Sequence, residues 1–299
     1  MRVRAPGKLL LTGAYAVLEG APAIVLAVDR YAIADDAHGA TSPSPEVHAA
    51  FRGARAPDVD ASALFDGEGH KLGLGSSAAV LVASLATKAA RDGQRLDDAS
   101  VRRRIFDEAC AAHAVVQSGG SGVDVAASVY GGVLRFRRDA NGACIEPVAL
   151  PPKLVVSVVW SGASARTSDL RARVDALRTR DAARYGACFA SLSLVARRAS
   201  DAIDARDSAA FLAAARAHAD ALVALGSAAD APIVPPAFAE LAVVAARSGA
   251  VFFPSGAGGG DVGVHLDAAP PSEDFLACAR TLGMHPLAVD IDRGGVQLA

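Results

Sequence analysis

The sequence predicts an α+β fold in two domains, and three observations support this. The chain has 299 residues, more than one hydrophobic core usually organises, and 52% of them are hydrophobic. Strand-like runs and helical runs are grouped along the chain, which favours α+β over a doubly wound parallel sheet. The segment Leu150-Pro151-Pro152-Lys153 interrupts regular structure near the middle. We therefore expect one domain over residues 1–151 and a second over 152–299.

Short apolar runs between turns predict the strands of the first domain. They are expected over 2–12, 23–34, 46–51, 133–137 and 144–148, with exposed connections at 41–45 and 55–60. Apolar residues at helical spacing, with serine and glycine at the ends, predict its helices. They are expected over 76–90, over 98–116, and from a start within 121–124 to an end at 131–132.

The second domain is predicted to begin with a strand over 154–160 and to continue with a long helical stretch over 168–225. Asp181 and Asp207 are expected to divide that stretch into separate helices. A strand over 250–254, a glycine-rich loop over 255–261 and a strand over 262–266 follow. A helix over 272–282 and a final strand pair through residue 297 complete the prediction.

Composition excludes several functional classes. A formal charge of −2 and a pI near 6.4 give no electrostatic reason to expect nucleic acid as a partner. The apolar stretch over 78–86 is too short to span a bilayer, so we expect no membrane partner. The four cysteines lack metal-ligand spacing, which is typical of reduced thiols in a cytoplasmic protein.

Leu72-Gly73-Leu74-Gly75-Ser76-Ser77-Ala78-Ala79 is the strongest functional signal, because it leads directly into an apolar helix. Glycines allow the backbone to approach a large anion, and the start of a helix offers free N–H groups. The two serines can cap the helix, bind phosphate oxygens or supply a hydroxyl to a metal ion. The loop is not a Walker A motif, because no Gly-Lys-Ser/Thr follows at the required spacing.

A second loop, Ser255-Gly256-Ala257-Gly258-Gly259-Gly260-Asp261, has four glycines in five positions. So many glycines cost backbone entropy, which favours close approach to a ligand or to the first glycine loop over a plain hairpin. A Rossmann motif is excluded, because a strand is expected after the loop rather than a helix.

Two further segments carry charged residues in unusual places. Asp124 follows a glycine-rich turn that opens a helix, where a carboxylate can cap the helix, bind magnesium or accept a proton. Lys8 lies in an otherwise apolar strand, where a lysine rarely occurs without a partner for its charge.

Together, these four segments resemble the GHMP kinases, the superfamily of galactokinase, homoserine kinase, mevalonate kinase and phosphomevalonate kinase. The resemblance covers nearly the whole chain in the family's order. It implies a ribosomal protein S5 domain 2-like N-terminal domain, a ferredoxin-like C-terminal domain, and the use of ATP with Mg²⁺. It also implies Asp124 as the catalytic aspartate, Lys8 as its catalytic partner, and Ser77 and Asp124 as magnesium ligands.

The same resemblance implies the binding residues. Those expected to bind ATP are Lys71, Gly73, Leu74, Gly75, Ser76, Ser77 and Ala78. Those expected to bind the acceptor are Lys8, Tyr15, His113, Gln117, Ser121, Gly122, Arg166, Thr167, Gly256, Ala257 and Gly258.

Finer features are similar to the phosphomevalonate kinases. His113 stands eleven residues before Asp124, where mevalonate kinases usually carry a metal-binding glutamate. The run from Ala112 to Gln117, the lysine before the first glycine loop, and the segment 160–168 agree with that subfamily. The implied reaction converts 5-phosphomevalonate to 5-diphosphomevalonate in isoprenoid precursor synthesis, in a monomer or homodimer.

Two alternatives remain open. The acceptor can be that of another GHMP kinase, with mevalonate ahead of homoserine or a sugar. The chain can also be a non-catalytic sensor of nucleotide and metabolite. Ala14 occupies the place of the family's usual glutamate, which favours the sensor, whereas Lys8, Ser77 and Asp124 favour a kinase.

Overall fold

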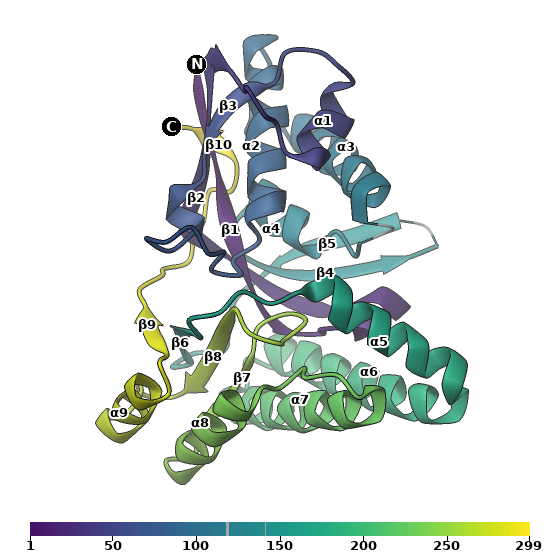
Figure 1. The fold of residues 1–299 in the computed structure, drawn as a ribbon, viewed down its shortest axis with the longest axis vertical. Coiled ribbons are helices and arrows are strands. Elements are labelled where there is room, and N and C mark those ends of the chain that lie inside the picture. The colour runs from purple at the N-terminus through teal and green to yellow at the C-terminus, as the bar shows by residue number, and fades with distance from the viewer. Residues whose placement is uncertain (118–119, 141) are drawn as a thin grey trace.

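The computed structural model describes residues 1–117, 120–140 and 142–299, and only the backbone of Gln117. The first sheet has the order β10-β1-β2-β4-β5, with β3 pairing the far end of β2, and all its pairs are antiparallel. Its strands are β1 (Arg2–Thr12), β2 (Ala23–Gly39), β3 (Pro57–Asp60), β4 (Val133–Asp139), β5 (Gly142–Val148) and β10 (Gln297–Leu298). The last strand therefore returns from the chain's end to the first sheet (Figure 1).

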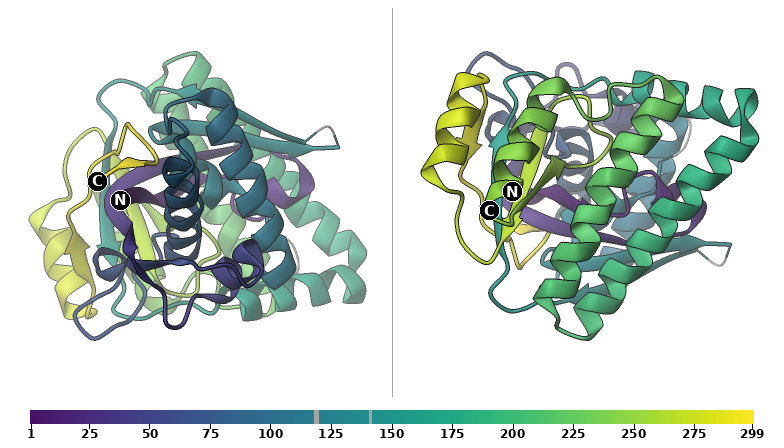
Figure 2. Two further views of the ribbon diagram at one scale, coloured as in Figure 1. Left: turned by 90° about the horizontal axis from the view of Figure 1, so that it is seen from above. Right: turned by 90° about the horizontal axis from the view of Figure 1, so that it is seen from below.

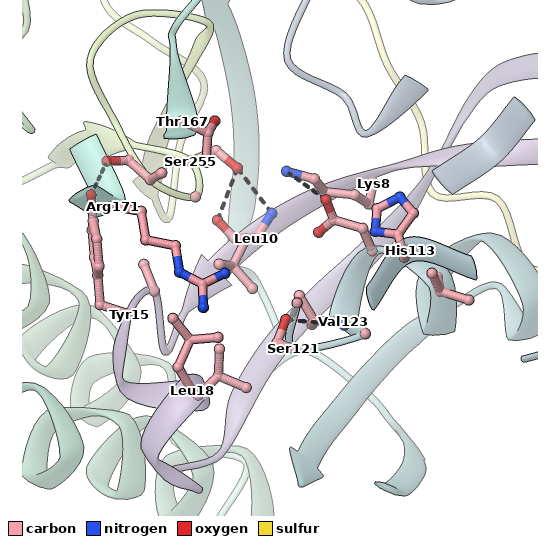
Figure 3. A pocket seen from close by; sticks show the side chains of 18 of the residues that line it. Lys8, Leu10, Tyr15, Leu18, His113, Ser121, Val123, Thr167, Arg171 and Ser255 are labelled. Carbon is pink, nitrogen blue, oxygen red and sulfur yellow. Dashed lines mark hydrogen bonds and ion pairs between the residues drawn. The ribbon is translucent and has the colours of Figure 1, made fainter. Parts of the chain in front are cut away.

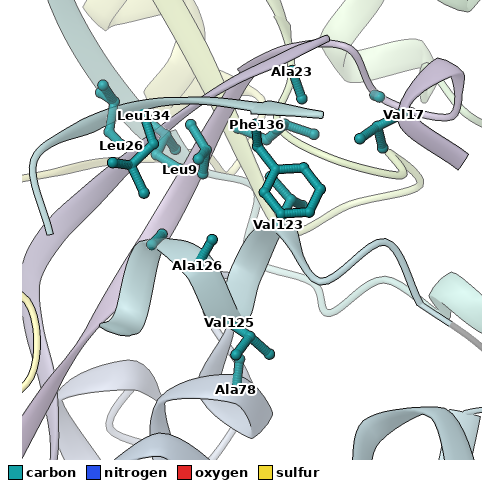
Figure 4. Packing of buried hydrophobic residues seen from close by; sticks show 14 of the residues in the cluster. Leu9, Val17, Ala23, Leu26, Ala78, Val123, Val125, Ala126, Leu134 and Phe136 are labelled. Atoms are coloured by element: carbon teal, nitrogen blue, oxygen red, sulfur yellow. The ribbon is translucent and has the colours of Figure 1, made fainter. Parts of the chain in front are cut away.

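Helices cover one face of this sheet (Figure 1). They are α1 (Pro45–Phe51), α2 (Ser76–Arg91), α3 (Ala99–Gln117) and α4 (Val123–Tyr130). Both α2 and α4 pack on β1 and β2. Figure 4 shows the resulting core, where Leu9 and Leu26 from the strands face Ala126 of α4 and are fully or almost fully buried. This packing fixes the starts of α2 and α4 beside β1.

The second sheet has the order β7-β8-β6-β9 and is also antiparallel. Its strands are β6 (Val155–Trp160), β7 (Val251–Pro254), β8 (Val262–Asp267) and β9 (His285–Leu287). Five helices accompany it in the described chain: α5 (Thr167–Arg180), α6 (Ala182–Asp204), α7 (Ser208–Ala229), α8 (Pro236–Arg247) and α9 (Glu273–Thr281). Figure 2 shows α5, α6 and α7 running side by side.

Among the described residues, only α7 is long and apolar enough, by length and composition, to span a membrane, with a mean hydropathy of 1.3. Its fully buried residues, such as Phe211, Ala215, Leu222 and Leu225, belong to the hydrophobic core. The helix also packs against α5, α6 and β7. Packing against these elements therefore accounts for its apolar residues.

Most predicted elements are confirmed, and the α+β class is confirmed with them. Asp181 and Asp207 do divide the long helical stretch, because each carboxylate accepts a hydrogen bond from the backbone of the helix that follows, at Arg184 and Ala210.

Four predictions need correction. Residues 46–51 form helix α1 rather than a strand, because Ser44 caps the helix at the Val47 amide and Pro45 suits its first turn. The expected connection at 55–60 contains β3, which pairs with β2 from Ile33 to Gly39, and β2 itself extends beyond the predicted end at residue 34. Helix α8 was not predicted. The final strands β9 and β10 pair with β6 and β1 rather than with each other.

Candidate active site

A cavity of about 200 Å³ lies where the two halves of the chain meet. Its walls come from β1, the short helix η1 (Ala16–Glu19), the starts of α4 and α5, and the second glycine loop (Figure 3). The lining residues are Lys8, Leu10, Ala14, Tyr15, Val17, Leu18, His113, Gly120, Ser121, Gly122, Val123, Asp124, Val125, Thr167, Arg171, Ser255, Gly256, Ala257 and Asp261. A concave site with apolar walls and a few converging charges is typical of small-molecule binding.

Lys8 and Asp124 meet at one side of this cavity. Lys8 is only 7% exposed, and its ammonium lies 3.8 Å from the Asp124 carboxylate and 3.4 Å from the Gly73 carbonyl. Asp124 lies in the first turn of α4, where the positive end of the helix favours its negative charge. The partner expected for the strand lysine is therefore present, and Lys8 lies between the cavity and the first glycine loop.

The first glycine loop ends in an open helix terminus. Gly75 is the N-cap of α2 with a left-handed backbone (φ 76°), and of the described residues none caps this helix with a side chain. The free N–H groups of the first turn therefore suit an anion such as a phosphate. A methyl group at Gly75 would lie 2.8 Å from Lys8 Cγ, so only glycine allows this approach.

Neither Ser76 nor Ser77 caps helix α2, so the roles that remain for them are binding phosphate oxygens and supplying a hydroxyl to a metal ion. The Ser77 hydroxyl instead forms a hydrogen bond of 3.1 Å with His113 Nε2. Ser77 and Asp124 offer hydroxyl and carboxylate oxygens, the donor type that Mg²⁺ prefers. These residues thus fit a magnesium ion, and the open helix terminus fits the phosphates of ATP.

The second glycine loop closes the other side of the cavity. Tyr15 donates a hydrogen bond of 2.7 Å to the Ala257 carbonyl, and the Ser255 hydroxyl bridges the backbone N–H and C=O of Leu10. Asp261 accepts a hydrogen bond of 2.9 Å from the Ala165 amide. Burial raises the pKa of the Asp261 carboxyl, against the lowering effects of that hydrogen bond and of the Lys8 charge.

Eight of the predicted acceptor-binding residues line the cavity, and so does Asp124, the predicted catalytic aspartate. The eight are Lys8, Tyr15, His113, Ser121, Gly122, Thr167, Gly256 and Ala257. Arg166 is exposed and Gly258 is buried against Ile233, so within the described chain neither lines it. The Gln117 side chain lies outside the described residues. Lys71 is exposed, and its carbonyl accepts a hydrogen bond from Ser164.

The sequence interpretation missed Arg171 and gave no role to Asp261, although both line the cavity. Arg171 follows Thr167 by four residues on α5, so the two share one helix face. That spacing was the available signal for Arg171.

Comparisons with known proteins agree with this geometry. A phosphomevalonate kinase from Streptomyces sp. (strain CL190) is 28% identical over 358 aligned positions, which cover 95% of this chain and 95% of the relative. The alignment is longer than the 299 residues of this chain, so the relative contains segments that this chain lacks. No family model matches the chain.

Solved structures establish the fold. A Lin0012 protein from Listeria innocua matches with a TM-score of 0.85 at 23% identity, over 100% of this chain and 99% of that one. The Streptococcus pneumoniae phosphomevalonate kinase, in complex with phosphomevalonate and AMPPNP, matches with a TM-score of 0.78 at 20% identity, over 97% and 99%. Mevalonate and homoserine kinases share the fold as well. The resemblance to the GHMP kinases is therefore confirmed, and these comparisons support a small-molecule kinase.

Proposed function

We propose that this chain, which has the GHMP kinase fold, transfers the γ-phosphoryl group of ATP to 5-phosphomevalonate in the cytoplasm. One observation carries the proposal. The Lys8 ammonium lies 3.8 Å from the Asp124 carboxylate and 3.4 Å from a carbonyl of the first glycine loop, so it joins the acceptor cavity to the phosphate-binding helix terminus. Phosphoryl transfer depends mainly on such positioning and on neutralising charge.

In the proposed reaction, a phosphate oxygen of the acceptor attacks the γ-phosphorus and the bond to ADP breaks. The products are ADP and 5-diphosphomevalonate. The α2 amides hold the ATP phosphates, and Lys8 lies where it can neutralise charge that develops on the transferred group. A magnesium ion held by Ser77 and Asp124 would neutralise further phosphate charge.

Asp124 acts mainly by holding Lys8 and orienting the acceptor. A phosphomonoester has a second pKa of about 6, so it is largely ionised at neutral pH and needs little help from a base. An alcohol acceptor such as mevalonate would need a proton removed. This difference is the chemical reason to test both acceptors.

His113 supports the phosphorylated acceptor over mevalonate. It lines the cavity and holds the Ser77 hydroxyl at 3.1 Å, at the position where a mevalonate kinase usually carries a glutamate. A neutral or cationic imidazole repels a second phosphate less than a carboxylate does. The sequence similarity to a phosphomevalonate kinase supports the same choice.

The test is ADP release by the purified chain with Mg-ATP and a panel of 5-phosphomevalonate, mevalonate, homoserine and galactose. We expect the highest kcat/KM with 5-phosphomevalonate, and a product heavier by one phosphoryl group in mass spectrometry. A higher kcat/KM with another acceptor would leave the kinase proposal intact and refute the acceptor. Nucleotide binding with no turnover of any acceptor would favour the sensor.

A further inference from the structure

Asp261 ends the second glycine loop in a backbone conformation that glycine would adopt more easily. Its φ is 56°, in the left-handed region that side chains other than those of Asn and Asp rarely enter. Gly258, Gly259 and Gly260 immediately before it also have positive φ angles. A further glycine would avoid this strain, and strained residues of this kind concentrate at functional sites.

Asp261 holds the segment 161–165, which connects strand β6 to helix α5. Its backbone N–H donates to the Ala163 carbonyl at 2.8 Å, and its carbonyl accepts from the Ser161 amide at 2.8 Å. Its carboxylate adds a third hydrogen bond, in which Oδ1 accepts from the Ala165 amide at 2.9 Å. Only this third bond requires the aspartate side chain, and it lies two residues before the start of α5 at Thr167.

The same side chain lies against the first glycine loop. A methyl group built at Gly73 would lie 2.2 Å from Asp261 Cβ and 2.8 Å from Asp261 Oδ2, so the carboxylate packs directly on Gly73. The carbonyl of Gly73 also accepts the 3.4 Å hydrogen bond from Lys8. Asp261 therefore contacts the residue that helps to hold the Lys8 ammonium beside Asp124.

Segment 161–165 also contacts the residue before the first loop. The hydroxyl of Ser164 in this segment donates a hydrogen bond of 2.9 Å to the Lys71 carbonyl. Burial raises the pKa of the Asp261 carboxyl, whereas the positive charges of Lys8 and Lys71 act to lower it. Asp261 therefore lies within reach of both lysine charges, at the place where the segment meets the loop.

We infer that Asp261 is a positioning residue, whose side chain fixes the first glycine loop and segment 161–165 relative to each other and so aligns the ATP phosphates with the acceptor. This inference rests on the proposed kinase function and deepens it. The first loop carries the open helix terminus for the phosphates, and segment 161–165 leads to Thr167 in the wall of the acceptor cavity. Phosphoryl transfer depends on such alignment, and a displacement of about 1 Å can lower the rate about 100-fold.

The experiment compares Asp261→Gly with Asp261→Asn. Glycine accepts the left-handed backbone, so this variant loses the side-chain contacts without adding backbone strain. Asparagine keeps the size of the side chain and an oxygen that can accept from the Ala165 amide, and it also tolerates the left-handed backbone. Both are assayed with saturating Mg-ATP and the acceptor of the panel that reacts best, below the midpoint of thermal unfolding.

Asp261→Gly should lower kcat roughly 10- to 100-fold, because the bound reactants lose their alignment. The acceptor KM and the calorimetric affinity for AMPPNP should change little, and Asp261→Asn should recover most of kcat. A lower unfolding midpoint with wild-type kcat would assign Asp261 a structural role and overturn the inference. A change confined to the acceptor KM would overturn it as well, and so would equal losses of kcat in both variants, since the charge alone would then matter.

The matched control is Asp230→Gly. Asp230 is another aspartate with a left-handed backbone, with φ of 51°, and it is exposed at the C-terminal end of α7. It lies outside the described lining of the cavity, so this variant should keep the wild-type kcat. A comparable loss of kcat in Asp230→Gly would show that the effect at Asp261 is not specific to the site, and would overturn the inference.

The design separates this inference from the proposed function. Because the assay uses whichever acceptor reacts best, an error in the proposed acceptor leaves the comparison of variants intact. A wild type that turns over no acceptor would refute the kinase proposal and the inference together. An active wild type with an equally active Asp261→Gly would refute the inference alone.

Discussion

The two glycine-rich loops are similar in sequence, but their glycines contact different parts of the protein. In the first, Gly75 leaves an uncapped helix terminus beside Lys8. In the second, Gly258, Gly259 and Gly260 face other parts of the protein: added methyl groups would lie 2.0 Å from the Ile233 carbonyl, 2.7 Å from Leu170 and 2.9 Å from the Ala163 carbonyl. A methyl group added at Gly256 would lie 3.6 Å from Lys8 Nζ, an ordinary contact distance. Of these four glycines, Gly256 alone therefore has space on the side of Lys8.

The difference teaches that glycine density by itself does not mark a ligand contact. The first loop is available to an anion because its N–H groups have no side-chain cap, whereas most glycines of the second loop allow protein segments to pack closely. The two loops also touch, since a methyl group at Gly73 would lie 2.2 Å from Asp261 Cβ. Changes near the first loop, Asp261 included, should therefore affect catalysis, and changes at the glycines of the second loop or behind it should affect stability.

The largest effect is expected where the first loop meets the Lys8–Asp124 pair. Lys8→Met and Asp124→Asn should each lower kcat about 10²- to 10³-fold, because removing one group aimed at transition-state charge costs about 2.7–4 kcal/mol. Turnover is measured with saturating ATP and the best acceptor, and circular dichroism checks the fold. Near-normal turnover in both folded variants would remove the pair from the mechanism.

Behind the second loop, His218 predicts a dependence of stability on pH. It lies on α7, is 1% exposed, and packs edge-on against Phe253, two residues before that loop. Burial lowers its pKa to about 4, from 6.5. The unfolded chain therefore binds the proton first as pH falls, and the folded state should lose roughly 3 kcal/mol between pH 6.5 and 4.

Urea unfolding at several pH values measures this loss, and His218→Leu is the comparison. The variant should show a shallower slope over the same window. Part of the slope should remain, because burial also lowers the pKa of His265. An unchanged slope in His218→Leu would contradict the assignment.

A pair of glycine substitutions tests the second loop directly. Both Gly258 and Gly256 have a left-handed backbone, with φ of 79° and 84°, so alanine at either position costs about 1–2 kcal/mol. Gly258→Ala should cost clearly more, because its methyl group would also meet the Ile233 backbone. Denaturant unfolding compares the two. A larger destabilisation by Gly256→Ala would show that the second loop is not primarily a packing device.

The sequence predicted those parts of the molecule that depend on local chemistry. Helix α2 and its glycine start, the aspartate caps of α6 and α7, and the lysine in β1 were all readable from neighbouring residues. The error at 46–51 was also local: an apolar run was weighted above the Ser44 cap and Pro45.

What stayed unpredicted depends on tertiary packing. Arg171 reaches the cavity because α5 begins beside β1 and η1, so its helical spacing from Thr167 indicates a place in the cavity only once that packing is known. Lys71 was expected to bind ATP from its place before the first glycine loop. It is exposed and, within the described chain, lies outside the cavity lining, so its role in binding ATP stays a prediction.

The smallest effect concerns the two serines of the first loop. Ser77 is the proposed magnesium ligand and is oriented by His113 at 3.1 Å, whereas Ser76 is only 8% exposed. Ser77→Ala should raise the Mg²⁺ concentration for half-maximal turnover roughly 10-fold, and Ser76→Ala should raise it less, because loss of a ligand or of its orientation weakens a metal site. Direct Mg²⁺-dependent nucleotide binding in both variants gives a readout independent of turnover. Equal responses would mean that the Ser77 hydroxyl contributes through its hydrogen bond to His113 alone, and that the first loop binds nucleotide through its backbone N–H groups.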